Sequence, residues 1–122
     1  MNGEVLDLPK EVHLCDMRGM LSFTILWLLS KRSMYGQELA TEIGKRRGEK
    51  PNPGTIYPAL KDLASHGLIE ARIEGRNSVY RLTEEGAVSL AKSKEYFERA
   101  FGDILLESGP RAMAKREPDP RL

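Results

Sequence analysis

The chain has 122 residues, of which 40% are hydrophobic and 30% are charged, and its formal net charge is +1. This length suggests one small domain with an appendage, and the composition excludes a globally disordered chain. The near-neutral charge gives no global sign of nucleic-acid binding, so such a function would depend on a local patch. Basic residues do gather locally, at Lys45, Arg46, Arg47, Lys50, Arg72, Arg76 and Arg81. Charge alone does not separate this patch from an ordinary solvated surface.

The chain carries no sign of a membrane segment, a metal site or a cofactor. Cys15 is the single cysteine, which rules out an intramolecular disulfide and suits a reducing compartment. There is no basic start followed by an apolar run, and the most apolar stretch, residues 20–29, is too short to cross a bilayer. His13 lies two residues before Cys15, but two ligands are too few for a metal site. We expect a soluble, cytoplasmic protein.

The N-terminal part is predicted to be an arm followed by a helix. Residues 1–15 form the arm, part of which is expected to pack against a partner subunit. The helix, from about residue 16 to 31, is apolar on nearly all sides, with Phe23 and Trp27 opposite its main apolar stripe. A helix of this kind must be covered on both sides. We expect the second cover from another subunit; the alternative is a central helix in a monomer.

A second helix is predicted from about residue 34 to 46, with Ser33 as its N-cap and Gly48 as its stop. Its inner stripe consists of Leu39, Ala40 and Ile43.

A third helix is predicted from about residue 53 to 66, with Asn52 as N-cap and Pro53 at the first helical position. Pro58 conflicts with a simple helix because it lacks a backbone N–H, so we expect a bent helix or a late start. Gly67 ends the helix. Its inward residues, at spacings of four and three, are Ile56, Leu60 and Leu63.

A two-stranded hairpin and a long helix complete the chain. The strands are residues 68–74 and 78–82, joined by a turn at residues 75–77. Thr83 caps the last helix, whose apolar positions are spaced as in a coiled-coil seam. Residues 108–122, rich in proline, glycine and charge, are expected to be a disordered tail. The predicted fold is mainly α with a small β-hairpin: a winged helix-turn-helix over residues 16–82 and a dimerisation helix over 83–107.

Four segments resemble those of a known family. They are YGQEL at 35–39, GTIYPAL at 54–60, GLI at 67–69 and YRLTEEG at 80–86. With the order of the elements, they resemble the PadR family of transcriptional regulators over about residues 18–105. That family carries a proline in its recognition helix, as here at Pro58.

The resemblance implies a winged-helix homodimer that represses transcription at inverted-repeat operators. It also implies that a small hydrophobic or aromatic effector can release the repressor. The single helix after the hairpin resembles the group with a short C-terminal region. Two departures are the longer N-terminal arm and the absence of a tryptophan from the last helix, which argues against a ligand pocket built on such a tryptophan pair.

The third helix is the predicted recognition helix, because a major groove admits one helix and its outward side chains read the bases. Lys61 can reach phosphate or guanine, and Arg76 at the hairpin tip suits the minor groove or the backbone. Tyr57 has two readings, a DNA contact or a packed ring with only its hydroxyl exposed. The predicted DNA contacts are Gln37, Gly54, Thr55, Tyr57, Pro58, Lys61, Arg76, Asn77 and Arg81.

The predicted dimer interface combines the first and last helices. It is expected either to leave a cavity for an effector or to be fully packed. Its residues are Phe23, Trp27, Leu90, Phe97, Phe101 and Ile104.

The sequence also bears on classes of function other than a sequence-specific regulator. An enzyme is not expected, because there is no glycine-rich phosphate loop and no nucleophile elbow. The stronger rival is a winged helix that binds nucleic acid without sequence preference or binds a protein partner. A regulator that responds to no ligand is a third reading.

Overall fold

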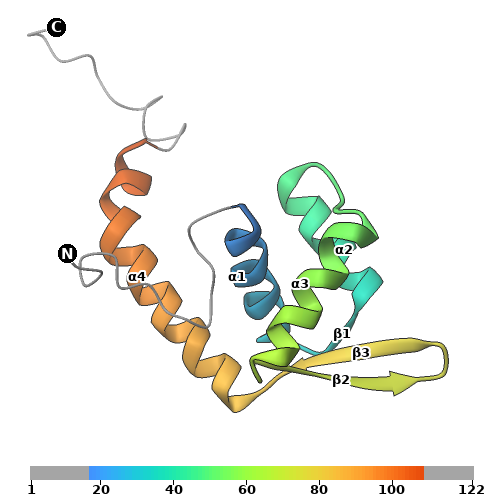
Figure 1. Cartoon of the computed structure of the whole chain (residues 1–122). Coiled ribbons are helices and arrows are strands. Elements are labelled where there is room, and N and C mark those ends of the chain that lie inside the picture. Colours follow the sequence, from blue (N-terminus) through green and yellow to red (C-terminus); the bar gives the residue numbers. More distant parts are fainter. Residues whose placement is uncertain (1–16, 109–122) are drawn as a thin grey trace, which may run out of the picture.

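The computed structural model describes residues 17–108. The predicted arm at residues 1–15 and almost all of the predicted tail therefore lie outside the described residues. Figure 1 shows a cluster of helices, a hairpin that extends from it, and a long last helix. In chain order the elements are α1 (Met17–Leu29), β1 (Met34–Tyr35), α2 (Gly36–Arg47), α3 (Pro53–Ser65), β2 (Ile69–Glu74), β3 (Asn77–Leu82) and α4 (Glu84–Ser108). The prediction of a winged helix followed by a long C-terminal helix is confirmed.

The hydrophobic core lies where α1, α2 and α3 meet above the sheet. Each helix contributes the apolar side that its spacing predicts. The predicted inner stripes of α2 and α3 are buried, with Ile43 and Ile56 almost fully so. The fully buried side chains are Leu21, Ile25, Leu26, Leu39, Ile43, Ile56, Leu60, Leu63, Leu68, Ile69 and Ser93.

The second apolar side of α1 is covered in part by the chain's own last helix. In Figure 1, α1 lies between α3 and α4. The Phe23 ring packs on the Phe97 ring of α4, with their centroids 4.8 Å apart. Another subunit was expected to supply this cover, but within the chain α4 itself supplies part of it, because its Phe97 ring packs on α1.

The second helix starts later than predicted, after residues 34 and 35. They form β1, which pairs antiparallel with β3 through Met34–Tyr80 and Tyr35–Val79. The helix begins at Gly36 with Tyr35 as its N-cap residue, so Ser33 is not the cap. The Tyr35 N–H donates to the Glu38 carboxylate at 2.9 Å. The helix starts later because these two residues form a third strand of the sheet. The strand order of the sheet is β1-β3-β2.

The recognition helix α3 forms without a late start. It begins at Pro53, with Asn52 as N-cap residue, and it contains Pro58 in its second turn. Pro58 is exposed, so its ring points away from the core. Gly67 follows α3 with a φ of +76°, a left-handed conformation that glycine adopts without steric cost. The predicted helix end is confirmed.

The β2–β3 hairpin is the wing. Its register runs from Ile69–Leu82 to Glu74–Asn77, so the turn consists of Gly75 and Arg76 alone. Gly75 has a φ of +65°, which a two-residue hairpin turn requires at its first central position. The predicted second strand therefore begins one residue earlier, at Asn77. Figure 1 shows the hairpin extending well beyond the helices.

The start of α4 is anchored to the sheet, and its last turns are not. The Gly86 N–H donates to the Thr83 hydroxyl at 3.0 Å, as the predicted cap requires. The Thr83 hydroxyl in turn donates to the Gly67 carbonyl at 2.6 Å. Further along, Ile104 and Leu105 are exposed. In the described part of the chain, no helix combines the length and apolarity needed to cross a membrane.

Candidate nucleic-acid interface

The recognition helix presents a continuous exposed face. Ile56, Leu60 and Leu63 fix its orientation, because all three are about 1% exposed in the core. The helix spacing then directs the intervening residues away from the core. Every predicted DNA contact is exposed: Gln37, Gly54, Thr55, Tyr57, Pro58, Lys61, Arg76, Asn77 and Arg81.

Two hollows lie beside this face, and Tyr57 separates them. The wing-side hollow, about 260 Å³, lies between the start of α2 and the wing, and is lined by Tyr35, Gly36, Gln37, Glu38, Tyr57, Arg76, Asn77, Ser78 and Tyr80. The turn-side hollow, about 490 Å³, lies between α2 and the start of α3, and is lined by Gly36, Gln37, Ala40, Lys50, Pro51, Asn52, Pro53, Ile56 and Tyr57.

The structure thus brings four of the predicted contacts together around one hollow. Gln37, Tyr57, Arg76 and Asn77, from three different elements, line the same wing-side hollow. Gly54, Thr55, Pro58 and Lys61 are exposed on α3 but line neither hollow. Arg81 lines neither hollow. It alternates with Tyr80 on β3, so it belongs to the opposite face of the wing.

The Tyr57 side chain is partly packed and partly exposed. It is 41% exposed, yet its ring lies against the start of α2. A Cβ added at Gly36 would lie 2.7 Å from the Tyr57 hydroxyl and 2.8 Å from its Cε1. Burial raises the pKa of the nearby Tyr80 hydroxyl, and proximity to Tyr57 raises it further. Tyr80 packs against the core, so it has a structural position, whereas Tyr57 faces solvent.

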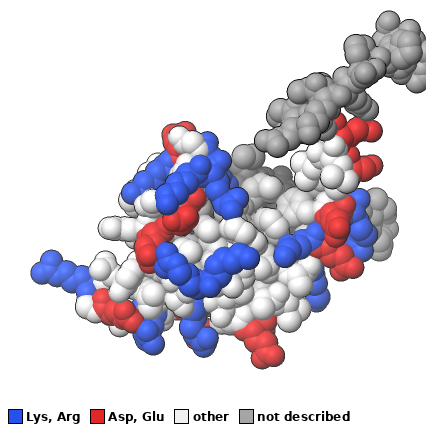
Figure 2. All heavy atoms as spheres, turned by 180° about the vertical axis from the view of Figure 1, so that it is seen from behind, with Lys and Arg blue, Asp and Glu red and all other residues white. Residues whose placement is uncertain are grey.

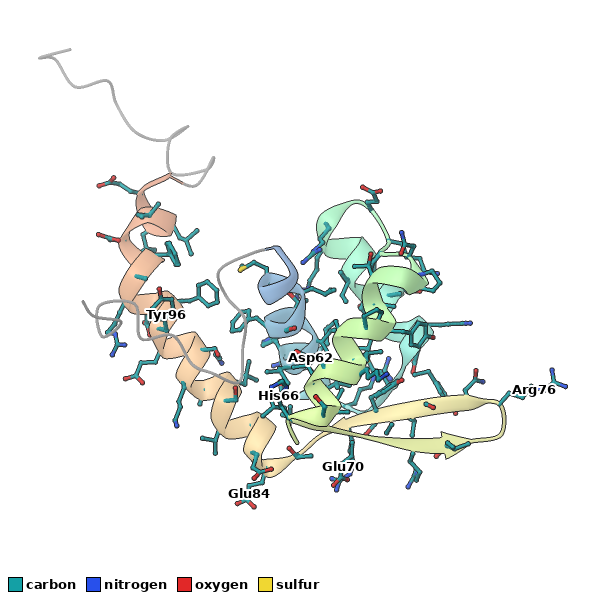
Figure 3. The ribbon with its side chains drawn as sticks, in the orientation of Figure 1. Asp62, His66, Glu70, Arg76, Glu84 and Tyr96 are labelled. Carbon is teal, nitrogen blue, oxygen red and sulfur yellow. The ribbon has the colours of Figure 1, made fainter. Side chains whose placement is uncertain are left out.

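The three arginines of the wing differ in their surroundings. Figure 3 shows Arg76 at the far tip of the hairpin, pointing away from the body. Among the described residues, Arg76 has no ion-pair partner. Arg72 pairs with Glu74, and Arg81 pairs with Glu70 at 2.7 Å. Only the tip arginine therefore carries its charge uncompensated by a neighbouring carboxylate.

A small polar network ties the wing to the start of α2. The Tyr35 hydroxyl donates to the Glu74 carboxylate at 3.0 Å. This hydrogen bond is the main cause that raises the pKa of Tyr35. The Arg72 guanidinium, and then Tyr35, hold the pKa of Glu74 below its ordinary value. Sequence reasoning missed Glu74 in this role, because the two ends of the bond are 39 residues apart.

The charge distribution over the surface is mixed. Figure 2 shows acidic side chains beside basic ones over the face opposite to the view of Figure 1. At the end of α3, Asp62 and His66 approach each other with an Nδ1–Oδ1 distance of 3.6 Å (Figure 3). Within residues 17–108, no three His, Cys, Asp or Glu side chains are grouped to hold a metal ion.

The predicted dimer residues fall into two sets. Leu90 is 6% exposed and belongs to the chain's own core, so its side chain is not free to meet a partner. Phe23, Phe97 and Phe101 form a stack along α1 and α4, with a distance of 5.6 Å between the centroids of the last two rings. Phe101 and Ile104 remain exposed on α4.

Trp27 lies beside a third hollow, between α1, α2 and α4. The Arg46 guanidinium lies 4.3 Å from the centre of the Trp27 ring, and the Lys31 ammonium lies 4.9 Å from it. Such cation–π contacts hold the ring in place. This hollow measures about 280 Å³ and is lined by Phe23, Thr24, Trp27, Arg46 and Lys94.

Comparison with known proteins agrees with this geometry. Residues 25–92 match the transcriptional regulator PadR-like family. The transcriptional activator GvpE1 of Halobacterium salinarum is 42% identical over 64 residues, which are 52% of this chain and 34% of the activator. The chain thus spans about a third of that relative's length. The transcriptional regulator Rv3488 of Mycobacterium tuberculosis is 29% identical over 92 residues, covering 72% of this chain and 85% of that protein.

A solved structure shows the same fold. The crystal structure of a PadR family transcription regulator from Clostridium difficile superposes with a TM-score of 0.61 and 28% identity, covering 71% of this chain and 95% of that one. The family match covers more than half of the chain, from the middle of α1 through the first turns of α4. The chain therefore belongs to the PadR-like family of transcriptional regulators.

Proposed function

We propose that this protein is a sequence-specific DNA-binding regulator that acts as a homodimer at an inverted repeat and represses transcription there. One observation carries the proposal: α3 and the tip of the wing both border the wing-side hollow, which Gln37, Tyr57, Arg76 and Asn77 line together. In winged helices, the recognition helix enters the major groove. The wing tip, where Arg76 has no ion-pair partner within residues 17–108, then reaches the adjoining backbone or minor groove.

The homodimer follows from the exposed apolar stripe on α4. Phe101, Ile104 and Leu105 are 40%, 52% and 70% exposed, which is unfavourable for a helix in water. A second copy of α4, with Phe23 and Phe97 beneath it, is the occupant that we propose. To bind an inverted repeat, such a pair would have to present its two recognition helices to half-sites about 34 Å apart in B-form DNA.

The proposed effector site is the hollow beside Trp27. Its two aromatic rings suit a small aromatic molecule, and its volume of about 280 Å³ is at the lower limit for such a ligand. Because the hollow is lined from α1, α2 and α4, a bound ligand would change how α4 meets the DNA-binding part. Trp27 is the only tryptophan, so quenching of its fluorescence by a panel of small aromatic compounds tests this step. An unchanged spectrum with every compound would argue against this hollow as the site.

The direction of regulation is proposed to be repression, because an occupied operator excludes polymerase without requiring another contact surface. The printed name of GvpE1 calls that relative an activator, so the direction needs its own test. A reporter placed behind the selected operator should lose expression when the protein is supplied. Increased expression would make this protein an activator.

Selection from a library of random-sequence duplexes tests the proposal as a whole. We expect enrichment of an inverted repeat that the protein binds as a dimer, in preference to a scrambled duplex of the same composition. Equal, salt-sensitive binding to both duplexes would instead indicate a winged helix that binds nucleic acid without sequence preference. No binding to either duplex would favour a winged helix that binds a protein partner.

A further inference from the structure

We propose that Gly36 is a positioning residue for Tyr57, and that the absence of a side chain at position 36 places the Tyr57 hydroxyl where it can contact DNA. This inference rests on the proposed function, because it assigns Tyr57 a partner in the nucleic acid. Gly36 was not among the predicted contacts, and it need not touch DNA to act.

The backbone of α2 gives no reason for a glycine at position 36. The described glycines with positive φ are Gly48, Gly67 and Gly75, so Gly36 has a conformation open to any residue. Glycine also loses more conformational freedom than alanine when it enters a helix. The reason for a glycine must therefore be the side chain that packs against position 36.

The Tyr57 ring packs against Gly36. A Cβ at Gly36 would come within 3.0 Å of three Tyr57 atoms, the hydroxyl oxygen, Cε1 and Cζ, and these are its three nearest atoms. Gly36 is buried although it has no side chain. The ring of Tyr57 thus crosses from α3 onto the first residue of α2.

This crossing determines where the hydroxyl lies. Gly36, Gln37 and Tyr57 are the three residues that line both hollows. The Tyr57 side chain therefore borders both hollows, and its hydroxyl lies over Gly36. A methyl group at position 36 would force the ring to swing away, because a tyrosine side chain has only two torsions with which to move. The fold would survive this movement, but the hydroxyl would be displaced.

A double-mutant cycle with Gly36→Ala and Tyr57→Ala tests the inference. The measured quantity is affinity for the duplex that the wild-type protein selects from a random library. Each single variant should lose roughly tenfold, since a hydrogen bond to a charged group such as phosphate contributes about that factor. The double variant should be no weaker than Tyr57→Ala, because without the ring a methyl group at position 36 displaces nothing.

A matched control comes from the same helix. A Cβ at Gly44 would lie 2.9 Å from the Cα of Lys50, and it would not meet Tyr57. Gly44→Ala should therefore have the same effect on affinity with and without Tyr57. Equal losses from Gly36→Ala in both backgrounds would overturn the inference, as would a Gly36→Ala variant that binds the duplex as tightly as the wild type.

The packing itself is tested without DNA. In the free protein, nuclear Overhauser cross-peaks should connect the Tyr57 ring protons to the α protons of Gly36, and circular dichroism should show a folded Gly36→Ala variant. Missing cross-peaks in the wild type would overturn the inference even if the protein binds its operator. Wild-type protein that selects no duplex would instead overturn the proposed function, whatever the cross-peaks show.

Discussion

At the scale of single residues, the wing shows how carboxylates can limit the charge available for DNA. Arg72 and Arg81 each lie against a glutamate, whereas Arg76 at the tip has no such neighbour in the described part of the chain. Exposed ion pairs contribute little to stability. Their larger effect here is on binding, because a paired guanidinium must exchange its carboxylate for a phosphate.

Arg76→Ala and Arg81→Ala should therefore differ in their effect on DNA binding. Loss of Arg76 removes an uncompensated charge, so we expect weaker binding to all duplexes and a salt slope lower by about one. Loss of Arg81 should change the slope less, because Glu70 already neutralises it. Affinity titrations at several salt concentrations measure both slopes. Equal slope changes would show that the Arg81–Glu70 pair opens when DNA binds.

A second residue-scale prediction concerns acid. The Tyr35 N–H, and then Arg32, hold the pKa of Glu38 below its ordinary value of 4.5. A lowered pKa in the folded state contributes stability above the ordinary pKa, and this contribution is lost as the pH falls through the folded-state pKa. Between about pH 6 and about pH 3, the melting temperature of the wild type should fall further than that of Glu38→Gln, which cannot titrate. Parallel curves would show that Glu38 contributes nothing to the acid sensitivity.

At the scale of elements, the junction between β2 and α4 determines where the last helix leaves the domain. The Thr83 N–H donates to the Leu68 carbonyl at 3.1 Å. The same carbonyl oxygen occupies the place where a Cβ of Gly86 would be. The first turn of α4 therefore rests directly on the backbone at the start of β2, and only a glycine permits this approach.

Gly86→Ala should destabilise the fold, because the added methyl group forces α4 away from the sheet. Overpacking of this kind costs about 1–3 kcal/mol, which lowers the melting temperature of a domain this size by roughly 4 °C or more. Gly102→Ala is the control on the same helix, since its Cβ would meet only the Glu98 Cγ at an ordinary 3.7 Å. Thermal unfolding followed by circular dichroism measures both. Similar melting temperatures for the two variants would contradict the close approach.

At the scale of the whole molecule, α4 has two roles along its length. Its first half packs on α1 of the same chain, where Leu90 and the Phe97 ring are covered. Its second half leaves Phe101, Ile104 and Leu105 exposed. We infer that the first half fixes the direction of the helix and that the second half offers the surface for a second copy.

Phe101→Glu should convert the proposed dimer to monomers, because a charge in the apolar stripe would be buried without a partner. Operator binding should fall with it, since a monomer engages only one half-site. Sedimentation equilibrium measures the mass, and gel-shift titration measures the binding. Arg99→Gln is the matched control, because it changes the net charge by the same amount on the opposite side of the helix. A dimer that survives Phe101→Glu would show that this stripe is not the interface.

The elements that the sequence predicted correctly are those specified by neighbouring residues. The inward stripe of Ile56, Leu60 and Leu63, the turn at Gly75 and the cap at Thr83 each depend on spacings of a few residues, which periodicity and turn chemistry reveal. The family segments then indicated what the third helix is for. Pro58 was expected to bend the helix or to delay its start; α3 begins at Pro53 without delay, and Pro58 is exposed in its second turn.

Only the tertiary structure decided the features whose partners are distant in the sequence. Residues 34 and 35 became a strand because β3 pairs with them, and α1 is covered in part by the chain's own α4. The contact of Tyr57 with Gly36 joins two helices, and the pairing of Arg81 with Glu70 joins two strands. Periodicity reports which side of an element is apolar, but it carries no information on which distant group that side will meet. The recognition helix and the wing were therefore readable from the sequence alone, whereas the positions of Tyr57 and of the wing arginines depended on the fold.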